Sequence, residues 1–188
     1  GKLLVIPVWF TNSDTYIPTD KRETVRDDIR KAYLGTNDET GWRSVKGYYE
    51  ELSMGKLNMN PVVSNWYECG MKSSEFYAEN EGLNKTQSLV NSATNWYKTV
   101  NGLSSLQNFD SDNNGFIDGV VLIYACPDYG SWEKYSAGYT NLWAYTYWLS
   151  DNPKNHQAPD KLLPDQSCKG SGLLSAHCKG SAAESVKA

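Results

Sequence analysis

Oxygen-bearing side chains alternate along the segment from Asp110 to Asp118, and this spacing is typical of a calcium-binding loop. Counted from Asp110, the loop has Asp112 at position three, Asn114 at position five and Asp118 at position nine. Phe116 stands at position seven, where a calcium loop offers a backbone carbonyl. Calcium takes about six to eight oxygen ligands, and alternate side chains of a tight loop point inward to supply them. We therefore predict a structural calcium site formed by Asp110, Asp112, Asn114, Phe116 and Asp118.

The end of this loop differs from that of an EF-hand. Gly115 at position six permits the sharp turn, but position twelve, where an EF-hand has a bidentate glutamate, is Val121. The remaining ligand must therefore come from another part of the chain or from water. The alternative is an Asx-rich turn without a metal. Carboxylates held inward by so short a loop repel one another unless a cation neutralises them, which favours calcium.

Short apolar segments predict the strands that position the loop. Residues 3–10 and 119–125 are typical of buried strands, and residues 141–149 predict a further strand with bulky side chains on both faces. Residues 56–69 predict one or two more strands, in which Pro61 indicates a sheet edge or a bend.

Helical spacing of apolar residues predicts the remaining elements. We expect helices at 42–52 and at about 84–100. A first helix is opened by Asp20 and Glu23, whose spacing is that of a capping box, and is ended by Gly35. Because strands and helices are interspersed along the chain, we predict a mixed α/β domain.

The composition changes at about residue 150. Three prolines interrupt a polar stretch, and the last residues are small and polar without hydrophobic periodicity. We therefore predict a domain over residues 1–149 and a polar, weakly structured or atypical tail over residues 150–188.

Bulk properties exclude several functional classes. The 188-residue length suits one domain, and the net charge of −4 argues against a nucleic-acid-binding surface, which needs a basic face. No apolar run approaches the roughly 18 residues of a membrane span. Abundant Trp and Tyr, together with many Asn and Ser, favour an extracellular location. We also expect a monomer. Gly1 directly before an apolar strand leads us to expect that the original N-terminus is missing.

The four cysteines do not form a metal or redox motif. No pair has the C-x-x-C spacing, and Cys126, at the end of an apolar segment, is expected to be a buried thiol. A disulfide between Cys168 and Cys178 and a pair of free thiols both remain open.

Four blocks in order resemble the start of the catalytic domain in the immune inhibitor A-like family of secreted zinc metallopeptidases. They are LLVIPVWF at 3–10, VKGYYEELSMGKLNMNPVVSNWYEC at 45–69, NFDSDNNGFIDGVVLIYA at 108–125 and LWAYTYWL at 142–149. The resemblance implies a zincin-like fold with a mixed sheet and flanking helices, secretion, and hydrolysis of peptide bonds in a protein or peptide substrate. It also implies zinc on an H-E-x-x-H helix, where two histidines bind the metal and the glutamate acts as general base.

The catalytic motif of that family is absent from this sequence. The only histidines are His156 and His177, and in the segment HCKGS at 177–181 the positions of the glutamate and the second histidine hold Cys178 and Ser181. We interpret that segment as chance within the polar tail, and we assign no catalytic residue and no zinc to this chain. The expected domain is therefore incomplete and inactive alone.

A different class of function remains open. The alternative is a non-catalytic, calcium-stabilised extracellular module that binds protein or carbohydrate. The aromatic residues of the segment WAYTYW at 143–148 could form a sugar-stacking platform, although aromatic strands are more often part of a core.

Overall fold

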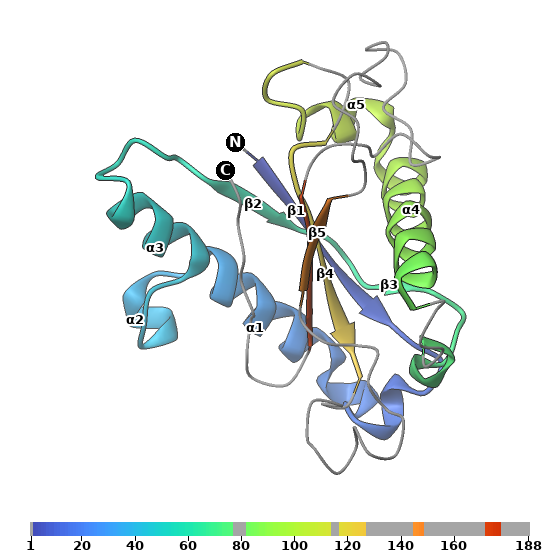
Figure 1. Ribbon diagram of the computed structural model, residues 1–188. Coiled ribbons are helices and arrows are strands. Elements are labelled where there is room, and N and C mark those ends of the chain that lie inside the picture. Colours follow the sequence, from blue (N-terminus) through green and yellow to red (C-terminus); the bar gives the residue numbers. More distant parts are fainter. Residues whose placement is uncertain (1, 77–81, 114–116, 127–144, 149–171, 178–188) are drawn as a thin grey trace.

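The computed structural model describes residues 2–76, 82–113, 117–126, 145–148 and 172–177. Its central feature is a six-stranded sheet in the order β2-β1-β4-β6-β5, with β3 also paired to β1. Helix α4 lies on one side of this sheet, and α1 and α3 lie on the other (Figure 1). The predicted class, a mixed α/β or α+β domain with flanking helices, is confirmed at this level.

The strands are parallel except at one edge. Strand β1, Lys2–Trp9, pairs in parallel with β2, Asn60–Val63, with β3, Tyr67–Glu68, and with β4, Val120–Ala125. Strand β6, Gly172–His177, continues the parallel arrangement beside β4, and β5, Tyr145–Trp148, is antiparallel to β6. Strands β1 and β4 are buried along almost their whole length, as expected for the middle of a sheet covered on both faces.

Alternation along the two central strands divides their side chains between two cores. Leu4, Ile6 and Leu122 face α4, Gly82–Asn101, and pack there with Leu89 and other buried residues of that helix. Val5, Val121 and Ile123 face α1, Arg22–Leu34, and pack with its buried residues Ile29 and Tyr33. This two-sided burial explains why the segments 3–10 and 119–125 are apolar without interruption.

Three predicted helices are present, with different beginnings from those expected. Helix α1 begins at Arg22 without a side-chain cap, because Asp20 lies in the 3-10 turn η2, Thr19–Lys21. The predicted capping box at Asp20 and Glu23 is therefore wrong, and Glu23 pairs instead with Arg26 at 2.8 Å. The 84–100 helix is confirmed within α4.

The predicted 42–52 helix begins three residues later than expected. Helix α3, Val45–Leu52, starts at Val45 because the Ser44 hydroxyl accepts a hydrogen bond from the Gly47 N–H. A separate short helix, α2, Asn37–Thr40, precedes it and carries a capping box between Thr36 and Glu39. The shorter elements not yet named are η1, Ser13–Thr15, η3, Ser73–Phe76, and α5, Leu103–Gln107.

The sheet extends beyond the predicted strands. Pro61 lies in β2, at the edge of the sheet as predicted, and the 141–149 strand is confirmed for residues 145–148. The tail prediction did not include β6, which lies between β4 and β5. Only Leu173 and Leu174 of the six residues in β6 are large and apolar, so its sequence gives a weak strand signal although it lies between two strands. The sheet therefore crosses the predicted boundary at residue 149, and the rest of the tail is outside the described residues.

Candidate metal site

The aspartate loop connects α5 to β4, and apolar residues hold both of its ends. Leu106 and Phe109 on the first side and Ile117 on the second are buried in the core that α4 covers. The Asp118 N–H donates to the Phe109 carbonyl at 2.8 Å, which closes the base of the loop. The loop is thus fixed at its ends by packing and by the backbone before any ligand is considered.

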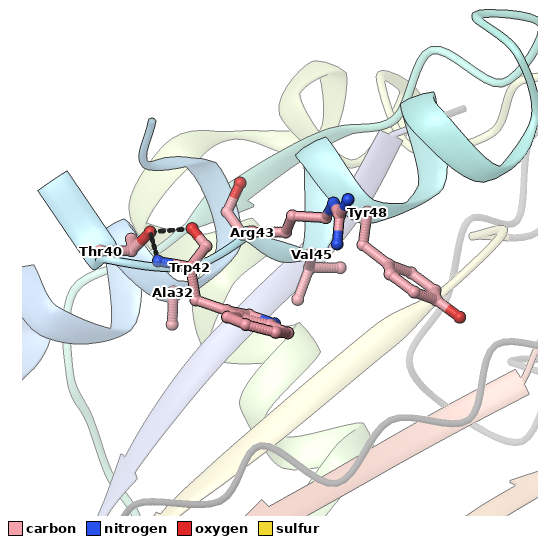
Figure 2. A pocket seen from close by; sticks show the side chains of 7 residues that line it. Ala32, Thr40, Trp42, Arg43, Val45 and Tyr48 are labelled. Atoms are coloured by element: carbon pink, nitrogen blue, oxygen red, sulfur yellow. Dashed lines mark hydrogen bonds between the residues drawn. The ribbon is translucent and has the colours of Figure 1, made fainter. Parts of the chain in front are cut away.

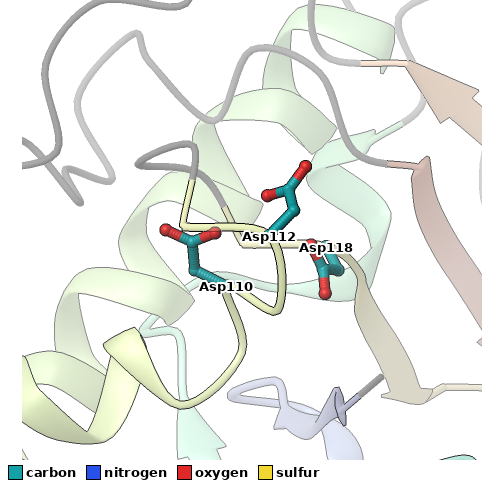
Figure 3. Close-up of side chains that lie close together, drawn as sticks. All are labelled: Asp110, Asp112 and Asp118. Atoms are coloured by element: carbon teal, nitrogen blue, oxygen red, sulfur yellow. The ribbon is translucent and has the colours of Figure 1, made fainter.

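Three of the predicted ligands lie together on this loop. One carboxylate oxygen from each of Asp110, Asp112 and Asp118 lies within 4.8 Å of the other two (Figure 3). Calcium–oxygen distances are about 2.3–2.6 Å, so two oxygens on opposite sides of one ion are at most about 5 Å apart. The spacing of the three carboxylates is therefore compatible with simultaneous contact to one cation. Asp110 is half-buried, and the other two are exposed.

The backbone of the loop is bent around these side chains. Asp118 accepts a hydrogen bond from the Ser111 N–H at 3.1 Å, and Asn113 has a left-handed backbone with φ of 55°. A turn without a metal accounts for both observations as well, since Asp and Asn commonly make such local bonds. Asn114 and Phe116 lie outside the described residues, so their predicted contacts stay predictions.

The ligand chemistry of the cluster favours a hard cation over zinc. Carboxylate oxygens are hard ligands that suit calcium or magnesium, whereas structural zinc sites are built mainly from cysteine and histidine. Over the described part of the chain, no other group of three acidic, histidine or cysteine side chains brings its ligand atoms so close together.

The cysteines in the described residues do not provide a second reactive site. Cys126 is buried, as predicted, and is 2% exposed. Burial raises the pKa of the Cys69 thiol, which disfavours its reactive thiolate form. Cys168 and Cys178 are outside the described residues, as is His156. His177 ends β6, where it is aligned with Tyr124 of β4.

The carboxyl ends of the parallel strands, where ligands commonly bind in such sheets, are closed between β1 and β4 by Ser13. Its buried hydroxyl donates to the Ala125 carbonyl at 2.5 Å and accepts from the Phe10 N–H at 2.7 Å. The side-chain amide of Asn12 also joins the β1–α1 connection to η3: it donates to the Ser73 hydroxyl and accepts from the Ser73 N–H. Local sequence patterns do not predict this contact, because partners 112 residues apart leave no local signal.

Comparisons with known proteins add no family assignment. No protein-family model matches the chain, and no curated protein shows a significant match. None of the helices in the described ranges is both long enough and apolar enough to span a bilayer.

Proposed function

We propose that the chain is part of an extracellular, metallopeptidase-like domain whose 110–118 loop binds a structural calcium ion. The observation that carries the calcium assignment is the cluster of Asp110, Asp112 and Asp118, with oxygens within 4.8 Å of one another. The sequence blocks at 3–10, 45–69, 108–125 and 142–149 support the zincin-like part of the proposal.

The position of the loop defines what the ion does. Strand β4 follows directly and pairs with both β1 and β6, so the loop sets where a central strand of the sheet begins. A cation between the carboxylates removes their mutual repulsion and fixes the path from α5 into that strand. The role is structural, because the loop leads directly into a central strand of the sheet.

Calorimetric titration of the metal-free chain with calcium tests the assignment. We expect about one ion per chain and at least about tenfold weaker binding in Asp112→Ala, because a charged ligand is lost. Magnesium should bind more weakly, since it requires a near-ideal octahedral site. The control is Asp20→Ala, which removes an exposed carboxylate of η2 and should leave binding unchanged. The site would be refuted if Asp112→Ala and Asp20→Ala lost calcium affinity equally, or if the parent chain bound no calcium.

The metallopeptidase part leads to a separate expectation. The 188 residues contain two histidines and no H-E-x-x-H, so we expect neither retained zinc nor chelator-sensitive cleavage of casein by this chain. A gene product that also supplies an H-E-x-x-H helix should cleave casein and hold about one zinc. Cleavage by the 188-residue chain would show that the active site is misassigned. Inactivity of a product with the helix would favour the non-catalytic module.

A further inference from the structure

Residues of α1, α2 and α3 line a surface cavity of about 440 Å³ (Figure 2). These helices lie away from the aspartate loop (Figure 1). The volume of the cavity falls within the range of about 300–1,000 Å³ that is usual for small-molecule sites. Ala32 and Val45 form an apolar part of its lining, and Thr40, Trp42 and Tyr48 form most of the remaining lining. The function proposed above makes no use of this cavity.

Two aromatic side chains of the cavity are exposed. Trp42 is 74% exposed and Tyr48 is 43% exposed, although folded chains usually bury most of a tryptophan. Figure 2 shows both rings projecting to the same side of the start of α3, with Val45 between them. An exposed tryptophan beside a tyrosine offers a large contact area with a polar group at the edge of each ring.

The backbone that carries these rings is held in place by local hydrogen bonds. The Thr40 hydroxyl accepts from the Trp42 N–H at 3.2 Å and also donates to the Trp42 carbonyl. Thr40 ends α2, whose capping box gives the Glu39 carboxylate a bond from the Thr36 N–H, and this bond lowers the pKa of Glu39. Tyr48 packs edge-to-face on Tyr49, with ring centroids 5.2 Å apart. The backbone at Trp42 and the ring of Tyr48 would therefore need little ordering when a ligand binds.

The charges beside the cavity are already paired. Arg43 makes a two-bond ion pair with Glu51, which raises the pKa of Arg43, and Lys46 pairs with Glu50 at 2.8 Å. An anionic ligand would have to compete with Glu51, and a cationic ligand would meet the Arg43 guanidinium. The occupant that fits these surroundings is neutral.

We propose that this cavity binds a neutral sugar residue of a polysaccharide, with Trp42 and Tyr48 as its contact walls. The C–H face of a pyranose ring is weakly electropositive and complements the negative face of an aromatic ring. Its hydroxyls can bond the Trp42 indole N–H and the Tyr48 hydroxyl. A purely aliphatic ligand would instead cover these two groups without giving them partners, which costs binding energy.

Native gel electrophoresis through soluble polysaccharides tests this proposal, using hydroxyethyl cellulose, glycol chitin and soluble starch as probes. At least one should retard the chain, and its hexasaccharide should quench tryptophan fluorescence with a Kd of about 1 mM, as expected for one sugar-sized contact. Trp42→Ala and Tyr48→Ala should each weaken binding at least about tenfold, and Trp42→Phe should retain part of it because an aromatic face remains.

Two control variants show whether sugar binding depends on this cavity. Tyr16→Ala removes a 38% exposed aromatic residue elsewhere, and Asp112→Ala alters the calcium loop; both should bind the sugar like the parent chain. Sugar binding that persists in Asp112→Ala supports the cavity whether or not the calcium assignment holds. The proposal is overturned if none of the three polysaccharides retards the chain. It is also overturned if Tyr16→Ala loses as much sugar affinity as Trp42→Ala and Tyr48→Ala. Selective binding of a leucine-rich peptide in place of sugars would also overturn it and assign a protein partner.

Discussion

Removal of calcium should lower the melting temperature of the chain by about 5–10 °C. A ligand that binds only the folded state stabilises it by about 2.7 kcal/mol when its free concentration is a hundred times Kd. For a domain of this size, each kcal/mol shifts the melting temperature by about 2–4 °C. The measurement is thermal unfolding followed by circular dichroism, with calcium in excess and then with a calcium chelator.

The Asp112→Ala variant distinguishes a metal site from an ordinary turn. In the chelator, this variant should be at least as stable as the parent chain, because one of three neighbouring negative charges is removed. In calcium, the variant should be less stable than the parent chain, because the variant binds the ion more weakly. The order of the two stabilities therefore reverses with the ion. A turn without a metal predicts the same difference in both solutions, and that result would contradict the calcium assignment. Asp20→Ala should show the full calcium response of the parent chain.

The parts of the fold that could be predicted from the sequence are those with strong local signals. Strands β1 and β4 are continuous apolar segments because both of their faces are covered, and α4 repeats apolar residues over many turns. Strand β6 has a weak signal, because only Leu173 and Leu174 of its six residues are large and apolar. The beginning of α1 differs from the prediction because the preceding 3-10 turn η2 moves Asp20 away from the cap position.

The two candidate sites also differ in whether the sequence alone predicts them. The carboxylate cluster was predictable because all of its members lie within one short loop, so the sequence spacing fixes their separation. The cavity at Trp42 was not predictable, because a tryptophan beside a helix is usually part of a core. Thr40 and Ser44 set the local turn that carries Trp42, but the packing of α2 and α3 against α1 is a tertiary effect.

Replacement of Ser13 by alanine should destabilise the chain by about 2–4 kcal/mol. The hydroxyl joins the β1–α1 connection to the end of β4 through one accepted and one donated hydrogen bond, and it is fully buried. Alanine removes both bonds with little change in volume, so the Phe10 N–H loses this acceptor and the Ala125 carbonyl loses this donor. Each buried polar group that loses its partner costs about 1–3 kcal/mol. Chemical denaturation monitored by fluorescence measures the loss.

Ser53 provides the matched control, because its hydroxyl makes the same pair of bonds in a more exposed place. It accepts from the Leu57 N–H at 2.8 Å and donates to the Glu50 carbonyl at 3.2 Å, in the turn after α3. Water can replace the lost partners there, so Ser53→Ala should cost no more than about 1 kcal/mol. Similar losses in both variants would mean that Ser13 contributes only local turn geometry. A loss of stability confined to Ser13→Ala would show that the buried hydroxyl holds the carboxyl ends of β1 and β4 together.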